Sequence, residues 1–234
     1  MMGMNIFSDL QSYANPEQAK NLQKFFKTGK GEYGEGDIFL GLKVPMIRTV
    51  AKKYISLDFA TLQEMLDSKI HEYRLCALLI LVLRNGKADT SMKDQIFDFY
   101  IQNTRNINNW DLVDLTAPGI VGNYLLDRDK ALLYTFARSK HLREKRIAII
   151  STFAFLRVGE YDDTFKIAEI LLNDSHDLIH KAVGWMLREV GKRSQFEEEK
   201  FLKKYYKTMP RTMLRYAIEK FPEQLRLQYL KNQI

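Results

Sequence analysis

The chain has 234 residues, of which 46% are hydrophobic and 28% charged, an ordinary balance for a globular protein that excludes general disorder. Lys and Arg total 36 against 29 Asp and Glu, and the resulting net charge of +7 favours a polyanionic partner. The single cysteine, Cys76, excludes an internal disulfide and lies in an apolar run that predicts burial. No long apolar segment opens the chain, and the apolar stretch 75–83 is too short to span a bilayer, so no membrane association and a cytoplasmic location are expected.

The first interruption of the helical pattern follows a helix-like segment at 22–27. Residues 29–34 read Gly-Lys-Gly-Glu-Tyr-Gly and match G-x-G-x-x-G literally. A dinucleotide-binding fingerprint needs a strand before the motif and a helix opening on its last glycine, and neither is expected here. No Gly-Lys-Ser/Thr follows, which also excludes a Walker A motif. We therefore predict a flexible loop between the first helices.

Cations followed by apolar helical runs recur through the rest of the chain. Arg74 and Arg146 are 72 residues apart, two periods of 36, and Lys181 and Arg215 follow after 35 and 34. One period past Arg74 falls on Trp110. A period near 35 with two helices per repeat predicts an α-solenoid with these cations along one face. Apolar residues recur at three- and four-residue intervals without sustained alternation, so no sheet is predicted.

The segment 110–114, Trp-Asp-Leu-Val-Asp, carries the strongest functional signal. If it is helical, Trp110 and Asp114 lie one turn apart on one face, whereas Asp111 lies about 100° around the helix and is interpreted as structural. A carboxylate beside an indole suits a site that binds a cation or stabilises a developing positive charge. The alternative is that Trp110 packs in the core while Asp114 caps a helix or pairs with an arginine. Trp185, one turn past Lys181, shares the repeat phase of Asp114, with core packing as its alternative.

The sequence gives little support for metal binding or catalysis by histidine or cysteine side chains. His176 and His180 are spaced to chelate a metal, but no Glu lies between them and no third ligand is spaced nearby. We predict surface or capping histidines, no metal site and no cofactor. No histidine falls near the Trp110 or Trp185 motif in repeat phase, so no proton donor is expected there. Cys76, if buried, is no nucleophile.

At these residues the chain resembles the AlkD-like DNA alkylation repair glycosylases, a family of HEAT-like helical repeat proteins. The similar segments occur in the right order along most of the chain: Phe-Leu-Gly-Leu-Lys-Val-Pro at 39–45 followed by Arg48, Asn-Trp-Asp-Leu-Val-Asp at 109–114, Arg-Ile-Ala-Ile at 146–149 and Lys-Ala-Val-Gly-Trp-Met-Leu-Arg-Glu at 181–189. The resemblance implies that Asp114 is the catalytic carboxylate. It also implies that Trp110 and Trp185 contact the deoxyribose of the lesion and that Arg146 holds the DNA backbone.

One departure from the family concerns the first helices. Where a characterised member has a tyrosine near the lesion, this chain has Phe25, or Phe26 if the alignment is shifted. Loss of that hydroxyl would weaken activity or alter the substrate range. The family also contains paralogues with little or no excision activity.

The expected fold is all-α: a right-handed superhelical α-solenoid of about six HEAT-like helix pairs with a concave basic face. We expect one domain over 1–234, with N-terminal helices and the Gly-rich loop over about 1–44 and repeats over about 45–234. The DNA-binding residues are expected to be Arg74, Arg146, Lys181, Arg215 and Phe25. Superhelical curvature must then bring the two tryptophans onto one nucleotide.

The expected function is a DNA glycosylase that acts as a monomer on double-stranded DNA containing alkylated bases. A purine alkylated at N3 or N7, such as 3-methyladenine or 7-methylguanine, is cationic and leaves as a neutral base without a general acid. A carboxylate can then stabilise the oxocarbenium-like sugar. The resemblance implies that the base need not be flipped into a pocket. Two alternatives stay open: a non-catalytic DNA-binding repeat protein, and a protein-interaction solenoid whose charge is incidental.

Overall fold

The computed structural model describes residues 5–234; residues 1–4, which the predicted domain includes, lie outside the described part. The described residues form helices joined by turns and loops, and their only β pairing is an isolated bridge between Ile38 and Ile70. The all-α prediction is therefore confirmed. Over the same residues, no helix combines the length and the apolar character needed to cross a membrane.

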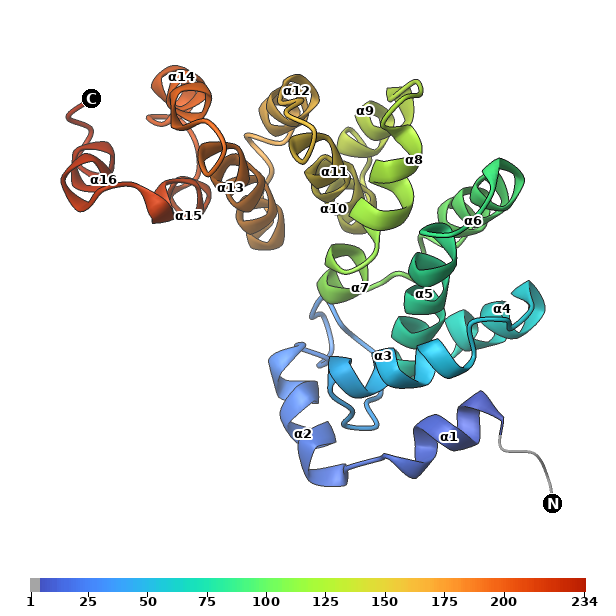
Figure 1. Ribbon diagram of the computed structural model, residues 1–234. Coiled ribbons are helices and arrows are strands. Elements are labelled where there is room, and N and C mark those ends of the chain that lie inside the picture. The colour runs from blue at the N-terminus through green and yellow to red at the C-terminus, as the bar shows by residue number, and fades with distance from the viewer. Residues whose placement is uncertain (1–4) are drawn as a thin grey trace. The chain divides into compact units, whose positions relative to one another are not determined.

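The chain divides into two compact units, residues 1–116 and 117–234. The helices of the first unit (Figure 1) are α1 (Ile6–Ser12), α2 (Pro16–Phe25), α3 (Val44–Lys53), α4 (Phe59–Asp67), α5 (His71–Asn85), α6 (Thr90–Gln102) and α7 (Trp110–Asp114). The second unit opens with a π-helical turn (Pro118–Gly122) and contains α8 (Asn123–Leu125), α9 (Ala131–Ala137), α10 (Leu142–Ser151), α11 (Phe153–Leu156), α12 (Asp162–Ile170), α13 (Asp177–Gly191), α14 (Gln195–Tyr205), α15 (Arg211–Ala217), a 3₁₀ turn (Ile218–Lys220) and α16 (Glu223–Leu230). A single repeat domain over 1–234 stays a prediction.

Short polar side chains fix where many of these helices begin. Each accepts a hydrogen bond from a backbone N–H of the first turn, which would otherwise lack a partner. The residues that cap helices in this way include Asn5, Asn15, Asp58, Asp89, Asn109 and Ser194. The starts of these helices are thus encoded by the local sequence and do not depend on tertiary packing.

Each unit is organised around one long helix. In the first unit α5 packs against α3, α4 and α6 and buries nearly every residue of its first three turns, including Cys76. In the second unit α13 packs against α10, α12, α14 and α15. The predicted burial of Cys76 is confirmed, and burial raises the pKa of its thiol to about 12.

The predicted repeat register is visible in the helix bounds. Arg146, Lys181 and Arg215 each lie four residues after the first residue of α10, α13 and α15. Arg74 lies three residues after the first residue of α5, and Trp110 is the first residue of α7. The period near 35 residues therefore marks the same position in α10, α13 and α15 and falls near the start of α5 and α7.

The G-x-G-x-x-G segment is a loop between α2 and α3, as predicted. Glu32 and Glu35 accept hydrogen bonds from the N–H groups of Gly29 and Gly31. A Cβ atom on Gly34 would meet the carbonyl oxygen of Phe26 at 2.5 Å, so the loop can turn back on α2 only with glycine there. The loop then runs to the start of α5, where the Ile38 N–H donates to the Lys69 carbonyl oxygen.

Glu198 on α14 is a buried carboxyl group, 1% exposed, that packs against Gly191 of α13. Burial, assisted by the charge of Glu199, raises the pKa of Glu198 from 4.5 to about 9. The folded state therefore keeps a proton that the unfolded state loses above pH 4.5. Stability from this group is greatest below pH 4.5 and falls as the pH rises toward 9.

We expect Glu198→Gln to raise the free energy of unfolding by about 1–3 kcal/mol at about pH 8, because the amide mimics the neutral acid. The gain shrinks to nothing as the pH falls to 4.5. Thermal unfolding followed by circular dichroism over this pH range measures the difference. Glu197→Gln, which changes a partly exposed carboxylate of the same helix near Lys200, is the matched control. A gain that does not grow with pH would contradict the prediction.

Candidate active site

Helix α7 carries the predicted carboxylate and indole. The Asn109 side chain caps it by accepting a hydrogen bond from the Trp110 N–H at 2.8 Å. Because 110–114 is helical, Trp110 and Asp114 lie one turn apart on one face, and both are half-buried. Asp114 is the last residue of α7, so it is not the N-cap of its own helix.

Asp114 lies near a buried tyrosine of α6. Tyr100 is fully buried, and its hydroxyl lies 3.0 Å from Thr116 Oγ1. Burial, with a further contribution from the charge of Asp114, raises the pKa of Tyr100. The phenol therefore stays protonated beside the carboxylate at neutral pH.

Two phenylalanines from the end of α2 support the indole of Trp110. Phe26 stacks on it with ring centroids 5.3 Å apart, and Phe25 meets it edge-on at 6.0 Å. Phe26 is 8% exposed and also stacks on Phe39, whereas Phe25 is 62% exposed. Of the two positions that the sequence left open, Phe25 is thus the accessible one and Phe26 is the packing partner.

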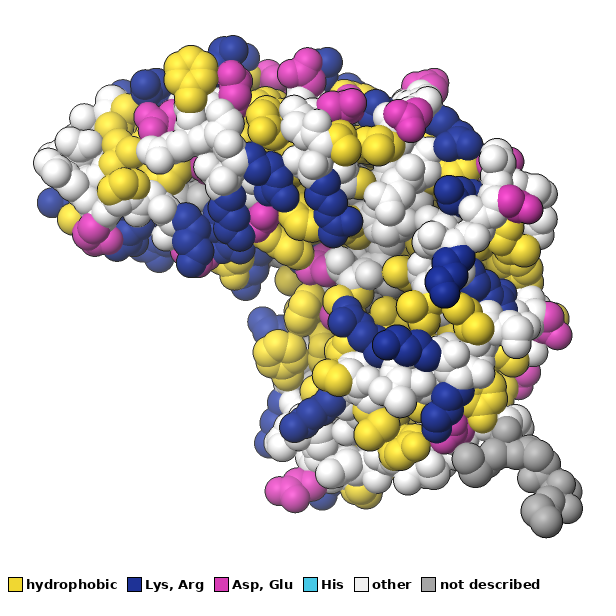
Figure 2. Space-filling view, viewed as in Figure 1, with side chains coloured by type: hydrophobic (Ala, Val, Ile, Leu, Met, Phe, Trp, Pro, Cys, Tyr) yellow, Lys and Arg dark blue, Asp and Glu magenta, His cyan; other side chains and the backbone are white. Residues whose placement is uncertain are grey.

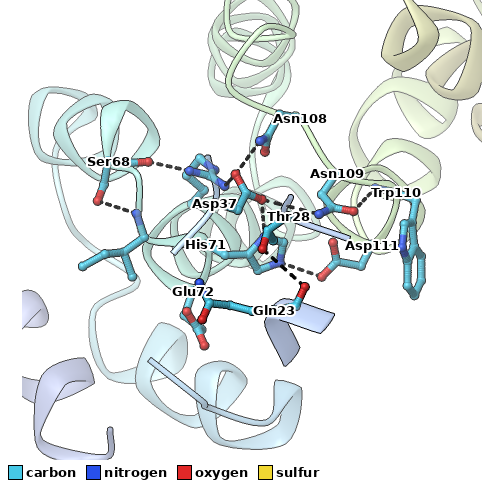
Figure 3. Close-up of polar contacts among 12 residues, drawn as sticks. Gln23, Thr28, Asp37, Ser68, His71, Glu72, Asn108, Asn109, Trp110 and Asp111 are labelled. Carbon is cyan, nitrogen blue, oxygen red and sulfur yellow. Dashed lines mark hydrogen bonds and ion pairs between the residues drawn. The ribbon is translucent and has the colours of Figure 1, made fainter. Parts of the chain in front are cut away.

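Beneath this aromatic cluster lies a buried network of charged groups (Figure 3). His71 Nε2 lies 2.8 Å from Asp111 Oδ2, and His71 Nδ1 lies 3.2 Å from Asp37 Oδ2. Asp37 Oδ1 accepts hydrogen bonds of 2.6 Å from Arg74 and from Asn108. The network joins the loop to α5 across 34 residues of sequence and α5 to α7 across 40 residues.

The network holds its groups in charged form. Burial opposes charge on His71, but the charge and hydrogen bond of Asp111 and the hydrogen bond of Asp37 together raise the pKa of His71 to about 9. Burial likewise opposes charge on Asp37, yet His71 and Arg74 lower the pKa of that carboxyl. Because the ordinary pKa of histidine is 6.5, His71 contributes stability that is complete below pH 6.5 and is lost as the pH rises through 9.

A second carboxylate of α5 clamps the loop directly. Glu72 is 1% exposed and accepts hydrogen bonds of 2.8–3.2 Å from the backbone N–H groups of Leu40, Gly41 and Leu42. Gly41 has a φ of 90°, and a Cβ atom there would meet the Asn15 carbonyl oxygen at 2.1 Å. The loop is therefore fixed against α5.

Two sequence-based interpretations change here. The expectation that no histidine lies near the Trp110 motif is wrong, because His71 contacts Asp111 directly. Arg74 is 4% exposed and donates to Asp37 and to the Ser68 carbonyl oxygen, so it holds the network and offers little surface to DNA. Asp111 pairs with His71, in line with its structural interpretation.

Trp185 lies in the second unit, on α13, and is half-buried. Its Nε1 donates to Glu189 Oε1 at 3.3 Å, and the Phe153 ring lies 6.3 Å away. Burial opposes charge on Glu189, but hydrogen bonds from Lys192 and Arg193 lower the pKa of its carboxyl. An ionised carboxylate thus fixes the edge of this indole.

The predicted DNA-binding cations of the second unit differ in environment. Arg146 is 6% exposed and donates to the Leu178 carbonyl oxygen at 2.5 Å. Lys181 is half-buried and pairs with Asp177 at 2.6 Å, whereas Arg215 is exposed. Lys and Arg side chains gather along one edge of the lobe formed by α13 to α15 in Figure 2.

Sequence reasoning missed two further cations near Trp185. The guanidinium groups of Arg157 and Arg193 lie 4.7 Å and 5.6 Å from the centre of the Phe153 ring. Phe153 contacts Trp185, so cations and aromatics form one cluster at this end of α11 and α13. Neither arginine belongs to the repeat register that identified the others.

His176 and His180 make hydrogen bonds with the backbone at the start of α13. His176 Nδ1 accepts a hydrogen bond from the Leu178 N–H, and His180 Nε2 lies 2.5 Å from the Asp174 carbonyl oxygen. The capping interpretation is therefore confirmed. Across residues 5–234, no group of three or more His, Cys, Asp or Glu side chains is placed to hold a metal ion.

Comparison with known proteins identifies the family of the chain. A family model described as DNA alkylation repair enzyme matches residues 6–221. In structure, the chain is similar to a "Predicted DNA alkylation repair enzyme from Enterococcus faecalis", with a TM-score of 0.70, 16% sequence identity, and 90% of this chain and 97% of that chain covered. No curated protein matches the chain in sequence. The chain belongs to the DNA alkylation repair enzyme family, and its all-helical architecture is consistent with the α-solenoid fold of that family.

Proposed function

We propose that the protein is a DNA glycosylase that excises cationic alkylpurines from duplex DNA by hydrolysing the N-glycosidic bond. The observation that carries this proposal is the half-buried Asp114, one turn from Trp110 on a helix whose start is locked by the network around His71. A pure DNA-binding surface gains nothing from a carboxylate that faces phosphates. A monomer that needs no cofactor is the expected form.

In the proposed reaction, the glycosidic bond between the sugar C1′ and N9 of the purine breaks, and its electron pair neutralises the positive charge that alkylation at N3 or N7 placed on the departing base. Positive charge then develops on the sugar, where the Asp114 carboxylate stabilises it and orients the attacking water. The water oxygen bonds to C1′ and its proton passes to solvent. The indole face of Trp110 adds cation–π attraction of roughly 0.5–2 kcal/mol.

Phe25 and Phe26 suit a supporting role in this reaction. Phe26 fixes the plane of the Trp110 indole from one side, while the exposed Phe25 offers an apolar ring beside it. Trp185, held by Glu189, is proposed to contact DNA through its indole. The direct test is an excision assay on duplexes that contain 7-methylguanine or 3-methyladenine, in which release of the base above the rate of the protein-free duplex supports the proposal.

DNA binding is proposed to use cations of the second unit, with Arg215 as the accessible member of the repeat register. We expect Arg215→Ala to weaken binding to any duplex and to flatten the plot of log affinity against log salt by about one unit, the loss of one phosphate contact. Fluorescence anisotropy over a range of salt concentrations measures the slope. Arg74→Ala is the matched control: it removes a buried, ion-paired arginine and should lower the melting temperature without changing the slope. An unchanged slope for Arg215→Ala would contradict this role.

The Arg146→Ala variant is tested by the same measurement of affinity against salt concentration. A slope flattened by about one unit in Arg146→Ala supports the phosphate contact that the family resemblance implies. A lower melting temperature with an unchanged slope instead indicates that its guanidinium only links α10 to the Leu178 carbonyl of α13.

A further inference from the structure

A cavity of about 300 Å³ opens in the first unit between α2, α3 and α5. Its apolar walls include Phe26, Phe39, Leu42, Ile47 and Leu75, all buried. This volume is at the lower end of ligand pockets, roughly 300–1,000 Å³, and suits one planar ring system better than a nucleoside or a peptide.

One buried polar atom of a residue that lines this cavity lacks a partner. Asp111 lines the cavity with a side chain that is 9% exposed, and its Oδ1 has no hydrogen-bond partner among the described residues. Its other oxygen, Oδ2, is held by His71, and Figure 3 shows the two oxygens pointing apart. A buried carboxylate oxygen without a donor is costly, so a ligand that supplies an N–H group gains a strong, charge-assisted hydrogen bond there.

The neighbouring charges decide what kind of ligand fits. The buried network beside the cavity contains the cations His71 and Arg74 and the carboxylates of Asp37, Glu72 and Asp111. A further cation, the exposed Lys43, lines the cavity. The N–H groups of His71 both point at carboxylates, so they are not available to an anion. The unpartnered carboxylate oxygen of Asp111 therefore favours a group that donates hydrogen bonds.

We propose that this cavity binds a purine base through a hydrogen bond from an N–H of the base to Asp111 Oδ1, with the ring packed against Phe26 and Phe39. The source is the base released by excision or a base turned out of the duplex, and in either case the chemistry is an aromatic heterocycle with an N–H donor. Only the source of the base depends on the proposed glycosylase function. The site is separate from Asp114, which does not line the cavity.

Equilibrium dialysis of the full-length protein with free adenine, 3-methyladenine and caffeine tests the site without requiring excision. Adenine and 3-methyladenine carry N–H donors, whereas caffeine is a purine with no N–H group. We expect caffeine to bind at least about 10-fold more weakly than adenine, the loss of one hydrogen bond to a charged acceptor. Equal binding of adenine and caffeine, or no binding of either methylated or unmethylated adenine, overturns the proposal.

Variants separate this site from the catalytic carboxylate. Asp111→Asn should weaken adenine binding by about 10-fold, and Asp114→Asn should leave it unchanged. Val44→Trp, at the half-buried rim of the cavity, should block adenine while leaving the contacts of Asp111 and His71 in place. Unaltered adenine binding by Val44→Trp overturns the proposal even if Asp111→Asn fails to fold.

A further arm identifies the source of the base. A duplex carrying 2-aminopurine becomes more fluorescent when that base is unstacked by the protein. If saturating adenine reverses this increase, the cavity receives a base from the duplex; without any increase, it receives the free base. If the protein binds adenine but excises no base, the purine site is supported and the proposed glycosylase function is refuted. If the protein excises alkylated bases but does not bind adenine, the glycosylase function is supported and the purine site is refuted.

Discussion

Asp114→Asn is expected to lower the excision rate for 7-methylguanine by at least about 100-fold while leaving DNA affinity unchanged or higher. The amide keeps the shape of the side chain but removes the negative charge that stabilises the sugar cation. Loss of that charge also removes repulsion between residue 114 and phosphate. Single-turnover excision and fluorescence anisotropy on the same duplex measure the two effects separately.

The matched control for Asp114→Asn is Asp127→Asn, which removes one exposed carboxylate from the second unit and changes the net charge by the same amount. It should excise at the wild-type rate, so that an effect of Asp114→Asn reflects the position of the charge. An Asp114→Asn rate within about twofold of wild type would remove Asp114 from the proposed reaction.

The second large effect concerns the charge of the lesion. We expect release of 3-methyladenine and 7-methylguanine, which leave unaided as neutral bases, and no measurable release of uracil, hypoxanthine or 8-oxoguanine. Those three are neutral in DNA and need a proton donor at the leaving group. Parallel assays on duplexes that differ only in the lesion measure the ratio of rates, which should reach several orders of magnitude.

The buried network bears on this selectivity, because it places a protonated histidine close to α7. His71 holds its proton at neutral pH, but its two ring nitrogens face Asp37 and Asp111 at 3.2 Å and 2.8 Å. With both N–H groups occupied and the side chain 2% exposed, His71 has no free donor for a departing base. Efficient release of uracil or hypoxanthine would mean that a donor acts in the site, and the proposed mechanism would then be wrong.

Local features of the sequence determined the secondary structure and the position of the candidate site. Helix periodicity, capping residues and the glycines of 29–34 act over a few residues, so they predict the all-α fold, the N-terminal loop and the shared face of Trp110 and Asp114. The repeat period also placed Arg146, Lys181 and Arg215 at the same position in α10, α13 and α15. These signals need no knowledge of what packs against each helix.

Only the tertiary structure decided what surrounds those residues. The pairs His71–Asp37 and His71–Asp111 join positions 34 and 40 residues apart, and no local pattern encodes a contact over that separation. The repeat register predicts that Arg74, Arg146 and Arg215 lie on one face. It does not predict their exposure, because tertiary packing buries the first two and leaves the third exposed. The same holds for Phe25 and Phe26, since adjacent residues of one helix end point in different directions and only neighbouring segments determine which of them meets solvent.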